Sequence, residues 1–157
     1  MFVQYYGLVE RPVADVARDL LAMGNGLSAT AAVAYRNGEA LIASLSGPGA
    51  GAKTVVVELG EPVRAADSTS VPLSWWATGT PGLFPTMEAD LIVAAMGPDL
   101  TQITFRGTYK PPLGLVGQVL DKALLHRFAE SSVKDFVDRI VSELGGGGIS
   151  AAEGSSG

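Results

Sequence analysis

The stretch from Gly114 to Leu144 limits the possible folds of this chain more than any other, because its second half predicts a strongly amphipathic helix. Charged residues fall on one side of that helix, and apolar residues recur on the other at spacings of three and four: Ala129, Val133, Phe136, Val137, Ile140, Val141 and Leu144. Pro111 and Pro112 place the start of the helix after them, and Gly145 favours its end. The apolar side must therefore be covered by another element.

The first half of the same stretch carries a second apolar stripe, formed by Val116, Val119, Leu120, Ala123 and Leu124. At about 100° per residue, its centre is rotated by roughly a third of a turn from the later stripe. Either the helix kinks between Leu125 and Phe128, or its early turns pack against a different element. We favour the second explanation, with the early turns facing a loop or the rim of a cavity.

The N-terminal part predicts a strand followed by a helix. Residues 2–9 are rich in aromatic and β-branched side chains, and Arg11-Pro12 then opens a helix that Gly24-Asn25-Gly26 stops. Residues 27–46 are ambiguous, because Asn37-Gly38 between apolar stretches is typical of a hairpin, whereas Ser28 and the alanine-rich segment favour a helix. We predict a second helix, interrupted or ended near Gly38.

Residues 47–54, GPGAGAKT, differ by one substitution from a phosphate-binding loop, with Ala52 where the second glycine belongs. Such a loop must follow a strand and open a helix, so that backbone amides and the helix N-terminus hold the phosphate. Here the segment leads into TVVVEL, which is a strand pattern. This context argues against nucleotide binding.

Four strands are predicted next, at residues 54–64, 70–78, 87–96 and 101–110, and the short turns between them indicate an antiparallel meander. Alternation assigns one apolar face to the meander, made of Leu73, Trp75, Ala77, Met87, Ala89, Leu91, Val93, Ile103, Phe105, Gly107 and Tyr109. The opposite face is polar, with Glu88, Asp90, Gln102, Thr104, Arg106 and Thr108. Trp76 also falls on this polar face, where we expect it to mark a partner surface.

Composition narrows the function classes. A net charge of −5 without a cluster of Lys and Arg argues against nucleic acid, and no apolar run reaches the ~20 residues that span a membrane. The absence of cysteine excludes disulfides and thiolate metal sites, and His126 is the only histidine, so we expect no metal and no cofactor. Without a signal-peptide pattern at the N-terminus, we expect a cytoplasmic protein.

Residues 1–144 predict one domain, and residues 145–157 predict a disordered Gly/Ser-rich tail.

The elements predict an α+β fold in which a curved antiparallel sheet wraps its apolar face around the long C-terminal helix. The segments VPLSWWATG, LFPTMEADL, ITFRGTYKPPLGLVGQVLD and KALLHRFAESSVKDFVDRIVSEL together resemble the SRPBCC superfamily of helix-grip proteins, which includes START-type lipid carriers and polyketide cyclases. The resemblance is greatest to small actinobacterial members. It implies a cavity between sheet and helix that holds a hydrophobic molecule, with polar lining residues doing the chemistry in cyclases.

Candidate ligand contacts follow from the apolar face and the helix: Trp75, Phe84, Met87, Phe105, Tyr109, Leu120, Leu124 and Phe128. We expect Trp75 to face the small Ala89 and Gly107 and leave a gap, although core packing alone is an equal alternative. Tyr109 either presents its hydroxyl inside the cavity mouth or, as the favoured alternative, is a core tyrosine whose hydroxyl reaches the surface. His126 lies four residues from Lys122 and from Glu130, which predicts a solvent-facing or rim position.

The leading hypothesis is therefore binding of a lipid-like or polyketide-like molecule between the sheet and the last helix. No catalytic constellation is visible, so an enzyme of the cyclase or dehydratase kind, using Tyr109, His126 or a cavity carboxylate, is the alternative. The third hypothesis is an interaction module with a filled cavity, and a homodimer through the polar face at Trp76 is part of that expectation. Glu88 and Arg106 on this face predict an exposed ion pair of little energetic value.

Overall fold

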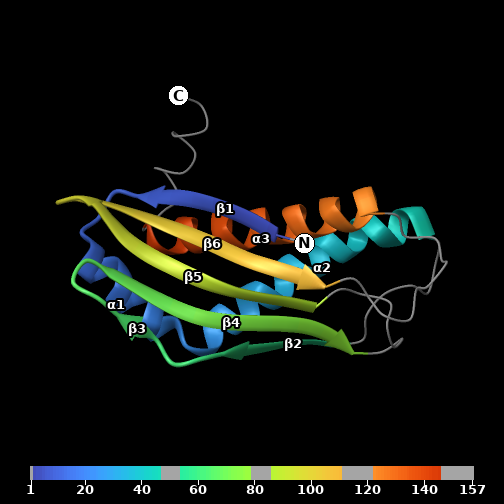
Figure 1. The fold of residues 1–157 in the computed structure, drawn as a ribbon, viewed down its shortest axis with the longest axis horizontal. Coiled ribbons are helices and arrows are strands. Elements are labelled where there is room, and N and C mark those ends of the chain that lie inside the picture. Colours follow the sequence, from blue (N-terminus) through green and yellow to red (C-terminus); the bar gives the residue numbers. More distant parts are fainter. Residues whose placement is uncertain (1, 47–53, 79–85, 111–121, 146–157) are drawn as a thin grey trace.

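The computed structural model describes residues 2–46, 54–78, 86–110 and 122–145. These residues form a curved antiparallel sheet with three helices on one face (Figure 1). The helices are α1 (Val13–Met23), α2 (Asn25–Ser46) and α3 (Lys122–Leu144). The strands are β1 (Phe2–Val9), β2 (Thr54–Leu59), β3 (Val63–Arg64), β4 (Ser68–Thr78), β5 (Thr86–Gly97) and β6 (Leu100–Lys110). The predicted α+β, helix-grip class is confirmed.

The sheet order is β1-β6-β5-β4-β2, with β3 pairing β4 beside β2. The predicted meander from β2 to β6 is therefore correct. β1 pairs with the other side of β6 and forms one edge of the sheet. The predicted strand at 54–64 is wrong in one respect, because it divides into β2 and β3. Between them the Gly60 amide donates to the Pro72 carbonyl at 2.7 Å, and Pro62 has no amide hydrogen for a ladder.

The inner face of the sheet, which the helices cover, holds the core. Leu73, Leu91, Val93, Ile103 and Phe105 are buried there as alternation predicted. From α3 they meet Val133, Phe136, Val137, Ile140, Val141 and Leu144, which are also buried. The predicted apolar side of the last helix is thus correct. The helix is uninterrupted from Lys122 to Leu144, through the point between Leu125 and Phe128 where a kink was considered. The earlier turns, with Val116, Val119 and Leu120, lie outside the described residues.

The second helix differs from its prediction. The helical alternative for residues 27–46 is correct, but α2 continues through Asn37-Gly38 to Ser46 without interruption. Its packing against α3 explains this, since Leu27, Ala31, Ala34 and Tyr35 are buried in the common core. Asn37 also donates its side-chain amide to Asp135 on α3 at 3.1 Å. Tertiary contacts have overridden the local preference of Asn-Gly for a turn. Gly24 alone, at φ +49°, separates α1 from α2.

Arg11 joins the end of β1 to the end of α3. Its guanidinium donates to the Leu144 carbonyl at 2.8 Å and to Asp19 on α1 at 2.7 Å. The same contact, chiefly the hydrogen bond from Arg11, holds the pKa of Asp19 below its usual range. The Thr101 hydroxyl in turn donates to the Arg11 carbonyl at 2.8 Å. One end of the sheet–helix interface is therefore closed by described polar contacts as well as by the apolar core.

Gly107 on β6 lies opposite Ala89 on β5, where there is no room for a side chain. A Cβ built there would lie 2.6 Å from the Ala89 Cβ and 2.9 Å from the Glu88 carbonyl oxygen. We expect Gly107→Ala to lower the free energy of unfolding by about 1–3 kcal/mol, because backbone must move to relieve the overlap. Gly97→Ala is the control, since its nearest neighbour would be the Leu100 Cβ at 3.9 Å. Urea unfolding of both variants measures the difference, and equal losses would contradict the β5–β6 geometry.

Candidate functional site

One row of side chains crosses the inner face where β4, β5 and β6 approach the beginning of α3. The strand register places Val57 opposite Trp75, Trp75 opposite Met87, and Met87 opposite Tyr109. Trp75, Met87 and Tyr109 are all buried. The row therefore forms an apolar wall that ends in a single phenol hydroxyl.

Trp75 belongs to an aromatic cluster that fills the middle of the interface. Its ring centroid lies 5.4 Å from Phe105 and 5.4 Å from Phe136, and the Phe136 ring meets both others edge-on. Only 1% of Trp75 is exposed. This geometry is that of favourable aromatic packing in a core.

The prediction that Trp75 faces Ala89 and Gly107 is wrong. Trp75 faces Met87, whereas Ala89 lies opposite Leu73 on one side and Gly107 on the other. The small residues therefore face each other rather than the indole. Their backbones approach so closely that a Cβ on Gly107 has no room. Trp75 is a core residue at this point of the sheet, and its role as a ligand contact stays a prediction.

Tyr109 and His126 meet at the end of this row. The Tyr109 hydroxyl lies 3.5 Å from His126 Nδ1, and the two rings are tilted with centroids 6.4 Å apart. On the far side of the imidazole, Nε2 lies 3.1 Å from the Glu130 carboxylate. Tyr109 is fully buried, while His126 and Glu130 are partly exposed. A chain of polar groups thus leads from the surface to a buried phenol.

This arrangement fixes the hydrogen-bond roles when the imidazole is neutral. Glu130 accepts from Nε2–H, which leaves Nδ1 as the acceptor for the Tyr109 hydroxyl. Burial raises the pKa of Tyr109, and the nearby Glu130 charge raises it further. The phenol is therefore held as a neutral hydrogen-bond donor. The favoured prediction of a core tyrosine is correct, but its hydroxyl does not reach the surface.

The raised pKa of Tyr109 has a consequence for stability in alkali. Below about pH 10 the phenol is neutral in both folded and unfolded chains. Above it the unfolded chain loses the proton first, so the free energy of unfolding falls by up to about 1.4 kcal/mol per pH unit for this one group. We expect Tyr109→Phe to remove that part of the slope.

Guanidinium unfolding between about pH 9 and pH 11.5 measures the slope across the range where a phenol titrates. Tyr5, whose pKa is also raised, chiefly by burial, contributes in the same direction and stays in both variants. Tyr6→Phe is the matched control, because Tyr6 is exposed on β1. A slope that Tyr6→Phe reduces and Tyr109→Phe leaves unchanged would contradict the burial of the Tyr109 phenol.

The remaining predicted site residues are distributed as follows. Phe128 is buried on α3 and meets Tyr35 of α2 edge-on, with ring centroids 5.1 Å apart. Phe84 and Leu120 lie outside the described residues, as does the side chain of Leu124. Tyr35 was missed from the sequence because it belongs to the ambiguous segment 27–46. Residues 47–53 of the phosphate-loop-like segment also lie outside the described residues, and the strand expected after them is β2.

The outer face of the sheet carries an open hollow of about 660 Å³. Its lining includes Phe2, Ser74, Glu88, Asp90, Arg106 and Thr108. The predicted Glu88–Arg106 pair is wrong, because the register places Arg106 opposite Asp90 and Glu88 approaches Lys110 at 3.6 Å. Trp76 is half-buried on this face beside Val56 of β2. A homodimer through this face stays a prediction.

Within the described segments no helix has the length and apolar character needed to cross a membrane. Nor do three or more His, Asp or Glu side chains come together there in a group that would hold a metal ion.

No family model matches the sequence, and no curated protein matches it significantly. Among solved structures, a conserved protein from Geobacillus kaustophilus is similar with a TM-score of 0.56 and 12% identity, over 92% of this chain and 95% of that chain. A hypothetical protein from Helicobacter pylori has a TM-score of 0.43 and 12% identity over 87% and 86%. The Zhui aromatase/cyclase from Streptomyces sp. R1128 has a TM-score of 0.46 and 13% identity over 92% and 93%.

The likeness to the Geobacillus protein supports the fold, and at this identity it supports the fold alone. Membership of the SRPBCC superfamily accordingly stays a resemblance of sequence that the architecture agrees with. The narrower resemblance to actinobacterial members receives no support from these comparisons.

Proposed function

We propose that the protein binds a small, mainly apolar molecule at the end of the sheet–helix interior where Tyr109 meets His126. The observation that carries the proposal is the pairing of a fully buried phenol with a partly exposed imidazole beside an apolar wall. Binding sites for such molecules combine apolar walls with a few convergent polar groups. The middle of the interface is filled by Trp75, Phe105 and Phe136, so the proposed site lies toward the beginning of α3.

The Tyr109–His126 pair limits the class of ligand that would bind. A neutral phenol donates one hydrogen bond, so an oxygen acceptor of a carbonyl, carboxyl or hydroxyl group would replace His126 Nδ1 as its partner. Met87 and Val57 on the same row would contact an apolar body. The ligand class is therefore a molecule with one oxygen function and a hydrocarbon or aromatic remainder, which includes the lipid-like and polyketide-like molecules that the sequence resemblance implies.

Native mass spectrometry of gently purified protein, combined with a fluorescent fatty acid such as cis-parinaric acid, tests the proposal. We expect a bound or displaceable apolar molecule, and we expect Tyr109→Phe to weaken probe binding by roughly tenfold, the equivalent of one hydrogen bond. Tyr6→Phe on the outer side of β1 should leave binding unchanged. A protein that carries no ligand and binds no probe would overturn the proposal.

A second candidate function is acid–base catalysis on the same ligand class, of the cyclase or dehydratase kind. The Tyr109–His126–Glu130 chain favours it, because a carboxylate orients the imidazole and the imidazole faces a hydroxyl that the interior shields from water. Such a site would pass a proton between the surface and a ligand oxygen. Turnover of a reactive poly-ketone probe that falls by about 10²–10⁴ in His126→Ala would support it. Binding without turnover would leave the carrier function alone.

A further inference from the structure

The outer edge of β1 lacks the features that usually protect a sheet edge. Its eight residues, FVQYYGLV, contain no charged residue and no proline, and they pair with β6 without a register shift. In the described part of the chain, no strand pairs with the other side of β1. Native proteins usually protect edges with charges, prolines, bulges or short strands. β2, at the opposite edge, is shorter, carries Glu58 and is soon followed by Pro62.

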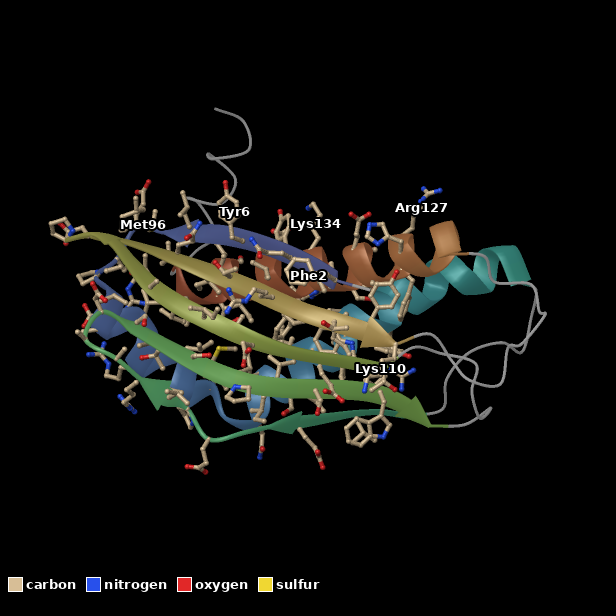
Figure 2. All side chains as sticks on the ribbon, in the orientation of Figure 1. Phe2, Tyr6, Met96, Lys110, Arg127 and Lys134 are labelled. Carbon is tan, nitrogen blue, oxygen red and sulfur yellow. The ribbon has the colours of Figure 1, made fainter. Side chains whose placement is uncertain are left out.

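A hollow of about 550 Å³ lies between this edge and α3. On the strand side it is lined by the consecutive residues Val3, Gln4 and Tyr5, and on the helix side by Arg127, Glu130, Ser131 and Lys134. Consecutive strand residues point to opposite faces of a sheet, so a hollow that touches all three reaches the backbone edge itself. Figure 2 shows Lys134 and Arg127 projecting from α3 beyond the margin that β1 forms.

Among the described residues, the charges around this hollow leave one cation without an ion-pair partner. Lys134 is paired with Asp138 at 2.7 Å and also lies over the Tyr5 ring, and Glu130 faces His126 at 3.1 Å. Within the described segments Arg127 forms no ion pair, and it is exposed. The hollow therefore complements a single carboxylate.

Three of the four outward side chains of the same strand are large, mainly apolar and exposed, and the fourth is Gln4. Phe2 is 59% exposed, Tyr6 55% and Leu8 41%. A strand added beside β1 would place every second side chain next to these three and the intervening ones over the hollow. An extended segment with apolar residues on one face and an acidic residue on the other meets both requirements.

A second copy of the chain fits this edge poorly. Strand pairing between two β1 edges would bring them about 4.8 Å apart. Of the strands in the sheet, α3 packs mainly against β1, with Val141 next to Gly7, so the two α3 helices would be drawn to nearly the same spacing. Packed helices need about 8–10 Å between their axes. A segment without its own helix on the inner face avoids this overlap.

We propose that β1 and α3 form a docking groove for an extended acidic peptide segment of another protein, which adds to the sheet as a strand beside β1 and places a carboxylate against Arg127. Strand addition supplies affinity through main-chain hydrogen bonds, and the hollow and Arg127 supply selectivity. The groove shares Glu130 with the proposed ligand site, but the β1 edge and Arg127 take no part in that site, so either proposal can fail without the other.

Fluorescence anisotropy with a labelled synthetic peptide tests the proposal. The probe is as long as β1, alternates valine with serine, and has one serine replaced by glutamate. Two further versions are N-methylated, one at every odd position and one at every even position. Strand addition uses the amides of alternate residues only, so one version should bind like the parent and the other should lose binding. Equal binding by both versions, or no binding by the parent peptide, would overturn the proposal.

Variants of the protein test the role of the Arg127 charge in peptide binding. Arg127→Glu should weaken binding of the glutamate peptide by about tenfold and leave binding of the all-serine version unchanged. Arg64→Glu on β3 is the matched control, because it makes the same charge change at an exposed position away from the groove. Equal effects of both variants would show attraction by net charge alone and contradict the groove.

Light scattering without peptide tests whether a second copy of the chain occupies the groove. Dimers that Tyr6→Lys on the edge strand abolishes would identify a second copy as the occupant and overturn the proposal.

Discussion

Trp75→Ala is expected to lower the free energy of unfolding by about 3–5 kcal/mol, the range for removing a large aromatic side chain from a packed core. The reason is the cluster in which Trp75 packs against Phe105 from the neighbouring part of the sheet and Phe136 from α3. Its removal would leave a cavity at the point where sheet and helix meet. Denaturant unfolding followed by far-ultraviolet circular dichroism measures the loss without depending on tryptophan fluorescence.

The adjacent residue provides the control. Trp76 has the same side chain but lies half-buried on the outer face, opposite Val56. Trp76→Ala should cost about 1 kcal/mol or less, as substitutions away from the core usually do. Equal losses for Trp75→Ala and Trp76→Ala would mean that the two faces of β4 have been assigned wrongly.

Removal of α3 is expected to abolish folding. A chain that ends at residue 121 would expose the part of the inner face that α3 covers, where Phe105 packs against Phe136, and would also lose the apolar side chains of α3 from the core. Each large apolar side chain returned to water costs about 1.5–3 kcal/mol, and a few of these exceed the whole stability of a typical domain. Loss of cooperative thermal unfolding and of dispersed amide signals in the NMR spectrum would show the effect.

A chain that ends at Gly145 is the matched truncation. Residues 146–157 have a composition that predicts little burial, so their removal should leave the melting temperature within about 2 °C of that of the full chain. A large loss of stability in this shorter chain would contradict the domain boundary at residue 144. A cooperative transition in the chain ending at residue 121 would contradict the central place of α3.

Periodicity was sufficient for β5, β6 and the last helix, each of which buries one side. Alternation along β5 and β6 predicted which residues face the helices, and the three-and-four spacing from Ala129 to Leu144 predicted the buried side of α3. Both patterns persist because a shift by one residue would turn the apolar set toward water. The fold class follows from these patterns, since a sheet and a helix that each have one apolar face must cover each other.

Periodicity does not predict the register between strands or the contacts between residues that are far apart in the sequence. Alternation places Trp75 on the inner face but does not say that Met87, rather than Ala89, lies opposite. Nor does local sequence show that α2 passes through Gly38, because its packing against α3 decides that. The Tyr109–His126 contact joins a strand end to a helix, and only the i, i+4 spacing of His126 and Glu130 hinted at part of it.

His126 offers the most direct test, because it is the only histidine in the chain and its imidazole nitrogens give unambiguous NMR signals. In alkaline solution we expect the tautomer that carries its proton on Nε2, with Nδ1 accepting from Tyr109. On addition of a displaceable fatty acid, both nitrogen shifts should change as the Tyr109 hydroxyl turns to the ligand oxygen, and Tyr109→Phe should suppress that change. A ligand that binds while both His126 nitrogen signals stay where they were would contradict the proposed site.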